Sequence, residues 1–159
     1  MILRGILLIF GVFSAMSVLS SENLNGFTFQ PYDYGWKGTF PRGDYKLFGK
    51  VVSVDIETRQ TPNNPMKLPN ISQAQEKLIH EIAVNIPSIL EIVEHKLTQF
   101  NKEHDREFYR FIDTPHVWLN SEEDNGKSWS FVVGRSDNPD FGYHLEFENQ
   151  KFIEIWAGD

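Results

Sequence analysis

A long apolar stripe in the middle of the chain constrains the fold more than any other feature of the sequence. From Ile71 to Phe100, apolar residues recur at steps of three or four, which is the spacing of one continuous helical face. Ser72 and Gln75 form a capping-box pattern at the start of this stripe. The pattern predicts one amphipathic helical region that buries a single face.

A proline interrupts this helical region. Pro87 lacks the backbone N–H that a helix needs, and its ring clashes with the preceding turn. A straight helix over 73–104 would also be about 48 Å long at the usual rise per residue, which is long for a small domain. We therefore expect the helix to kink or restart at residues 85–88.

The periodicity changes to two after the helical region. Alternating apolar and polar residues predict four strands, and Asn125-Gly126 is a strong hairpin signal between the first two. These strands are expected over 115–119, 128–133, 143–148 and 151–157, and one further strand over 45–57 precedes the helix. This order predicts an α+β domain, an antiparallel meander sheet with one kinked helical region packed on one face.

The first twenty residues have the composition of a signal peptide. Met1 to Arg4 carry one positive charge, fifteen uncharged residues follow from Gly5 to Leu19, and small residues come next. A retained anchor is the alternative, but fifteen residues are too few to cross a bilayer. We expect export, periplasmic or extracellular, with no membrane span after cleavage. The chain then divides into a signal peptide over 1–20, an aromatic and glycine-rich segment over 21–44, and one α+β domain over 45–159.

Composition excludes several classes of function. The 159 residues contain no cysteine, so zinc ribbons, thiol catalysis and disulfide frameworks are excluded. The formal net charge of -7 argues against a nucleic-acid partner, because binding nucleic acid requires clustered positive charge. Histidine spacing fits no zinc motif, and the acidic loops 122–126 and 137–140 lack the spacing of a calcium loop. We expect no catalytic residues, no metal ligands and no cofactor.

The predicted meander has a second face of unusual composition. If its apolar residues point at the helix, the opposite face mixes aromatic rings, histidines and carboxylates, a mixture typical of binding surfaces. Its members are His116, Trp118, Ser128, Ser130, His144, Glu146, Phe152, Glu154 and Trp156. The predicted binding residues among them are His116, Trp118, His144, Glu146, Phe152 and Trp156. The alternative is that the aromatic segment 27–40 folds over this face and turns it into a second small core.

The order of elements over residues 45–159 resembles small bacterial α+β domains of unknown function, some of which are associated with polymorphic-toxin immunity. The resemblance lies in the order and spacing of a strand, a helix containing 81–86, a proline-led strand at 115–119, a strand centred on Trp129 and a closing hairpin that ends at 155–159. It implies a protein that works by binding, with an acidity suited to a basic partner. The predicted export departs from the resemblance, because many immunity proteins are cytoplasmic. No family residue roles carry over.

Three functions are therefore open. The first is an exported, non-enzymatic protein-binding domain with an unknown, basic partner. The second is an envelope glycan-binding module that uses Tyr32, Tyr34, Trp36, Trp118 or Trp156. The third is a hydrolase built on His144 with Glu146 or Glu154, since residues two apart on a strand share a face. The same face could also be the interface of a homodimer.

Overall fold

The computed structural model describes residues 22–24, 27–32, 35–41, 44–59, 71–104, 113–119 and 127–158. The predicted signal peptide, Tyr34 and the Asn125-Gly126 turn lie outside the described residues. The elements are β1 (Glu22–Leu24), β2 (Phe27–Tyr32), β3 (Gly35–Thr39), β4 (Lys46–Leu47), β5 (Lys50–Val51), β6 (Asp55–Arg59), α1 (Gln73–His104), β7 (His116–Leu119), β8 (Ser128–Arg135), β9 (Asn138–Glu148) and β10 (Lys151–Gly158).

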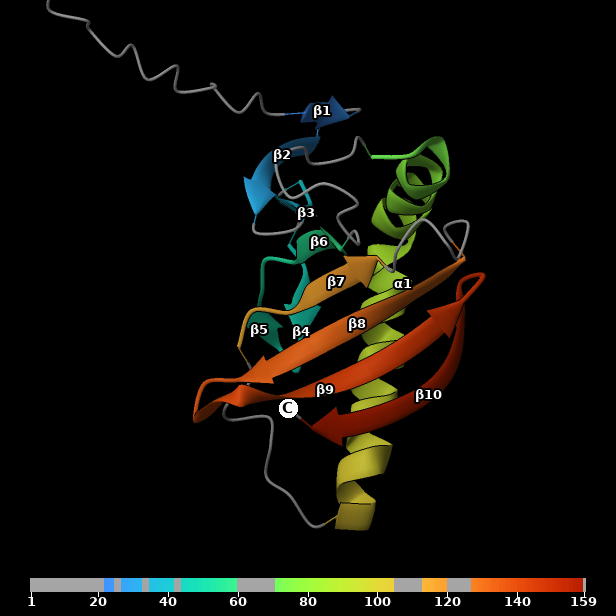
Figure 1. The fold of residues 1–159 in the computed structure, drawn as a ribbon. Coiled ribbons are helices and arrows are strands. Elements are labelled where there is room, and N and C mark those ends of the chain that lie inside the picture. The colour runs from blue at the N-terminus through green and yellow to red at the C-terminus, as the bar shows by residue number, and fades with distance from the viewer. Residues whose placement is uncertain are drawn as a thin grey trace, which may run out of the picture.

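One sheet organises the fold. Eight strands follow the order β1-β2-β3-β6-β7-β8-β9-β10, and every neighbouring pair is antiparallel except β6 and β7. The helix α1 connects this parallel pair and lies across one face of the sheet (Figure 1). The predicted α+β class, with a helix on a mostly antiparallel sheet, is confirmed, and β7 to β10 form the expected meander.

The strand expected over 45–57 is instead a hairpin of two short strands followed by a separate strand. Residues 46–51 form the short hairpin β4–β5, whose turn residues Phe48 and Gly49 both have positive φ, as a tight two-residue turn requires. The backbone N–H of Phe48 donates to the carboxylate of Glu94 on α1, which ties the hairpin to the helix. Only β6, after this hairpin, enters the main sheet.

The helix continues through Pro87, so of the kink or restart expected at residues 85–88 the restart does not occur. Its capping box is present, because the Ser72 N–H donates to Gln75 Oε1 at 3.0 Å and the Gln75 N–H donates to Ser72 Oγ at 3.2 Å. Pro87 is exposed, so its lost hydrogen bond lies on the solvent side, where long helices open slightly. There the Asn85 side-chain amide donates to the carbonyl of Glu81 at 2.8 Å.

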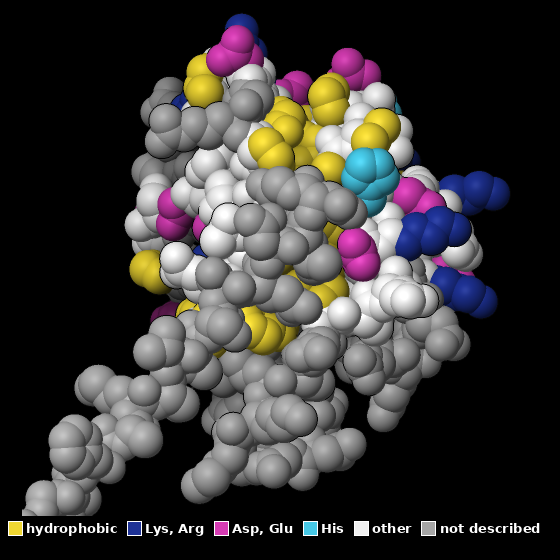
Figure 2. Space-filling model, turned by 90° about the horizontal axis from the view of Figure 1, so that it is seen from above, with side chains coloured by type: hydrophobic (Ala, Val, Ile, Leu, Met, Phe, Trp, Pro, Cys, Tyr) yellow, Lys and Arg dark blue, Asp and Glu magenta, His cyan; other side chains and the backbone are white. Residues whose placement is uncertain are grey.

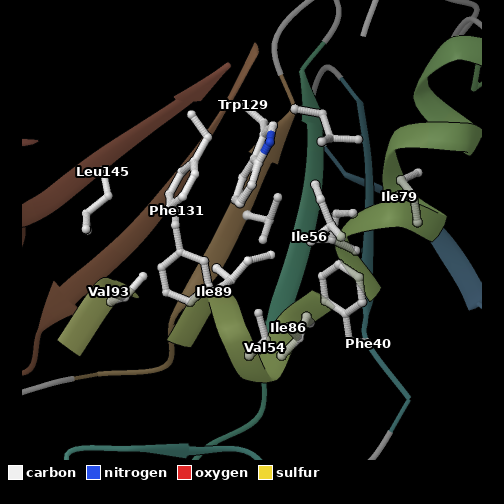
Figure 3. Close-up of a cluster of buried hydrophobic side chains, with 14 of the residues drawn as sticks. Phe40, Val54, Ile56, Ile79, Ile86, Ile89, Val93, Trp129, Phe131 and Leu145 are labelled. Carbon is white, nitrogen blue, oxygen red and sulfur yellow. The ribbon is translucent and has the colours of Figure 1, made fainter. Parts of the chain in front are cut away.

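The apolar stripe of α1 packs on one face of the sheet (Figure 3). Trp129 lies at the centre of the sheet side of this core and stacks on Phe147, with ring centroids 4.2 Å apart. The residues labelled in Figure 3 show both layers, with Ile79, Ile86, Ile89 and Val93 from the helix and Ile56, Trp129, Phe131 and Leu145 from the sheet. Among the described residues, no helix has the length and apolar character needed to cross a bilayer.

The described parts of the N-terminal segment belong to the same sheet. Strand β2 pairs with β3, and β3 pairs with β6. Phe27, Phe29, Trp36 and Phe40 contribute to the core on the helix side. Gly38 lets β3 approach this core, because an added Cβ would lie 3.1 Å from the Phe29 ring. In the end view of Figure 2, hydrophobic side chains show at the centre, and several Lys and Arg side chains gather at one edge.

Candidate functional site

The face of the sheet turned away from α1 carries the candidate site, and we call it the open face. None of the described helices or strands packs over it (Figure 1). Strand pairing arranges its residues in two parallel lines that cross the strands. The first line contains Thr39, Asp55, His116, Val132, His144 and Trp156, and the second contains Lys37, Glu57, Trp118, Ser130, Glu146 and Glu154.

Four rings form a continuous chain across the open face, and we call them the aromatic row: His116, Trp118, His144 and Trp156. Ring centroids are 5.1 Å apart between His116 and Trp118, and 5.2 Å apart between Trp118 and His144. The rings of His144 and Trp156 stack at 3.7 Å with 3° between their planes.

The small residues of β8 allow this arrangement. Trp118 on β7 and His144 on β9 are separated by β8, which carries Ser130 and Val132 at this level. Because these two side chains are short, the larger rings meet above them. His144 is consequently only 5% exposed, and Ser130 and Val132 are buried too. The open face therefore has its own small layer of packed rings.

Glu146 holds the outer end of the aromatic row. Its Oε2 accepts a hydrogen bond from Ser130 Oγ at 2.7 Å, and its Oε1 accepts one from Trp156 Nε1 at 3.1 Å. These bonds and the stacked His144 fix the ring of Trp156, a residue that is nevertheless 41% exposed. Trp156 is thus a pre-oriented aromatic surface.

The opposite end of the open face, on β3 and β6, carries an ion-pair network. Lys37 Nζ lies 3.2 Å from Glu57 and 3.6 Å from Asp55, and Thr39 Oγ1 donates to Asp55 at 2.8 Å. Burial opposes the charged form of Lys37, but the hydrogen bond to Glu57 and the two carboxylate charges raise its pKa. Lys37 offsets only one of the two formal negative charges of Asp55 and Glu57, so this end of the face keeps a net negative charge.

A hollow continues the open face beyond Lys37. It has a volume of about 440 Å³ and is lined mainly by β2 and β3. Tyr32, with Lys37 Nζ 5.4 Å from its ring centroid, is exposed at its side. The remaining lining residues are Thr28, Gln30, Pro31, Gly38 and Thr39.

His116, at the β7 end of the aromatic row, is harder to protonate than an ordinary histidine. Burial lowers the pKa of His116 from its ordinary value of 6.5, although the charge of Glu57 and the backbone at Thr114 act in the opposite direction. The folded state therefore binds fewer protons at this position than the unfolded state. Stability must fall as the pH drops through 6.5 toward the lowered pKa of the folded state.

We expect His116→Gln to reduce this acid-induced loss of stability, because glutamine does not titrate. The measurement is the urea midpoint at about pH 7.5 and about pH 5.5 for the wild type and the variant. His80→Gln, at an exposed histidine on α1, is the matched control and should keep the wild-type loss. An unchanged loss in His116→Gln would contradict the expectation.

Five of the six predicted binding residues come together on the open face, namely His116, Trp118, His144, Glu146 and Trp156. The expected placement of Phe152 on this face was wrong. Phe152 pairs with Phe147, and its ring lies 6.0 Å from that core ring on the helix side. The pairing register shifts between Phe152 and Glu154, so the extra residue Ile153 reverses the alternation.

Sequence reasoning also missed one end of the site. Asp55 and Glu57 were visible as the polar side of an alternating strand, but Lys37 had no such signal. Their contact depends on β3 and β6 being neighbours. The alternative that segment 27–40 folds over the face is not what the described residues do, since β2 and β3 extend the sheet sideways and Trp36 is buried on the helix side.

The arrangement suits binding better than hydrolysis. His144 is buried between two tryptophan rings, and the carboxylate oxygens of Glu146 are engaged by Ser130 and Trp156. Glu154 pairs across the strands with Glu146, not with His144. A substrate would therefore have to displace rings before reaching either His144 or the buried Ser130 hydroxyl.

The described residues contain no group of three or more His, Cys, Asp or Glu side chains placed to hold a metal ion. In the acidic stretch 137–140, whose last three residues belong to β9, the Asp137 carboxylate accepts hydrogen bonds from Arg135, which hold the pKa of Asp137 below its ordinary value. The loop 122–126 lies outside the described residues.

Comparisons of the chain with protein-family models, curated proteins and solved structures find no significant match. The resemblance to immunity-associated domains therefore stays a prediction.

Proposed function

We propose that the protein is a non-enzymatic binding protein that recognises a basic protein partner through the open face. The observation that carries the proposal is the aromatic row, a packed set of rings on a sheet face that no described element covers. Aromatic rings in a packed centre with polar groups at the rim are typical of protein interfaces. Because the rings are already ordered, a partner would lose little free energy in arranging them.

Charge supports a basic partner. Lys37 pairs with both Asp55 and Glu57 and offsets only one of their two formal charges, and none of the ion pairs among the described residues reaches Glu146 or Glu154. The whole chain carries a formal charge of -7. Two copies of such a face would repel each other, so the charge disfavours a homodimer and favours a positively charged partner.

The proposal places this function outside the cytoplasm, in keeping with the signal-peptide pattern of residues 1–20. A protein of this kind acts by occupying its partner's surface. Neutralisation of a basic toxin, as the resemblance implies, is one form of such action.

Selection from a displayed random-peptide library tests the proposal without a known partner. Peptides are selected on the wild-type protein and then measured on the double variant Glu154→Lys/Trp156→Ser. Both changed residues are exposed on the edge strand β10, so the core should be unaffected. Val84→Ser, an exposed position on α1, is the matched control. We expect basic peptides that bind the wild type and the control at least about tenfold more tightly than the double variant.

Three outcomes would overturn the proposal. The library could yield no ligand, or its ligands could bind all three proteins equally. Alternatively, envelope oligosaccharides, and not peptides, could change the tryptophan fluorescence of the wild type. That last result would establish the glycan-binding alternative, with Tyr32, Trp118 and Trp156 as its exposed or half-buried rings.

A further inference from the structure

Resting on the proposed function, we infer that the β9–β10 end of the open face binds an arginine side chain of the partner. Its guanidinium group stacks on the outer face of Trp156 and pairs with the carboxylate of Glu154. The inference goes beyond a general preference for basic partners, because it names the group bound and the residues that bind it.

The Trp156 ring is prepared for such stacking. His144 covers one of its faces at 3.7 Å, and the Nε1–H bond to Glu146 at 3.1 Å fixes its rotation. The residue as a whole is still 41% exposed. An exposed indole face attracts a cation through its negative π-electron density, most effectively when the ring needs no reorganisation.

Among the described residues, the carboxylates beside the ring form no ion pair, although Lys96 lines the same small hollow as Glu154. Glu146 and Glu154 face each other directly across β9 and β10, and like charges in this position destabilise a sheet. Glu146 already accepts hydrogen bonds from Ser130 and Trp156. Within the described part of the chain, no hydrogen bond or ion pair engages the exposed Glu154. A cation placed there would relieve the repulsion between the two carboxylates.

Arginine fits this position better than lysine. A guanidinium group is planar, so one flat surface can lie on the indole while its edge donates two hydrogen bonds to a carboxylate. Glu154 and Trp156 are two residues apart on the same face of one strand, which is the separation that such a group can span. An ammonium group is more strongly hydrated and cannot make both contacts in this way.

Titration of the full chain with short peptides tests the inference. The probes are three pentapeptides with blocked termini, used at about 0.15 M ionic strength. In each one, two of the five residues are arginine, lysine or citrulline, and the others are glycine. The readout is the NMR resonance of each tryptophan indole N–H, assigned by single Trp→Phe variants. We expect the arginine peptide to shift the Trp156 resonance and to bind at least about threefold more tightly than the lysine peptide, and the citrulline peptide to cause no shift.

A pair of isosteric variants separates specific contact from general attraction. Glu154→Gln should weaken binding of the arginine peptide about fivefold or more. Glu148→Gln removes the same charge from an exposed residue on the same face of β9. It should change the affinity for the arginine peptide less than twofold, because salt screens the attraction between the peptide and a charge that it does not contact. Neither change should affect folding, because both side chains are exposed.

Equal losses in the two variants, equal affinities for arginine and lysine peptides, or no shift at Trp156 would each overturn the inference. A failure of the arginine site can be distinguished from a failure of the proposed function. If library ligands still require the open face while arginine peptides leave Trp156 unshifted, the arginine site is wrong and the binding function stands. If neither set of ligands depends on the face, both are wrong.

Discussion

Trp129→Ala is expected to lower the free energy of unfolding by about 3–5 kcal/mol, which would leave a domain of this size barely folded. Trp129 has no exposed surface and stacks on Phe147 beneath the helix stripe (Figure 3). Its removal leaves a cavity that the surrounding isoleucines cannot fill without breaking their own packing. Its buried Nε1 has no hydrogen-bond partner among the described residues, so the loss would be one of packing alone.

Urea denaturation of the wild type and Trp129→Ala measures this effect. Val84→Ala, at a helix position that is 67% exposed, is the control and should change the free energy of unfolding by less than about 0.5 kcal/mol. A loss of less than about 1 kcal/mol in Trp129→Ala would contradict the placement of this ring at the centre of the core.

Pro87→Ala is expected to raise the free energy of unfolding by about 2 kcal/mol. Proline in a helix interior is about 3 kcal/mol less favourable than alanine. The substitution also frees the unfolded chain, which offsets up to about 1 kcal/mol of this gain. Because Pro87 is exposed and α1 already continues through it, no packing is lost. The new N–H can bond the carbonyl of Ala83.

The same denaturation experiment checks this prediction, with Ser88→Ala as the control. Ser88 is the next residue, is also exposed, and should gain only about 0.5 kcal/mol from its higher helix propensity. A lower stability of Pro87→Ala would mean that the helix needs the proline in order to follow the sheet.

Much of the local structure was predictable because neighbouring residues decide it. The capping box at Ser72 and Gln75 acts within one turn, and both predicted hydrogen bonds are present. The alternation of buried and less buried residues in β7 follows from the pleat of a single strand. The four candidate binding residues on β7 and β9 could be placed on the same face of their own strand by this pattern alone.

The failures share a different cause. The sequence of β10, from Phe152 to Trp156, fits either of two alternations, and the bulge at Ile153 arises only from its pairing with β9. Ile153 is therefore 56% exposed, whereas Phe152 packs on the core ring of Phe147. A bulge of one residue reverses every later side chain, which no pattern within one strand can reveal.

The sequence by itself determined the α+β class, the helical region with its buried stripe and its cap, and the alternating faces of β7, β8 and β9. These depend on the 3.6- and two-residue periods of the backbone. Only the tertiary structure decided the parallel pairing of β6 with β7, the contact of Lys37 with Glu57, and the meeting of Trp118 with His144 above β8. Those features depend on which strands become neighbours, and burial of the whole core makes that choice.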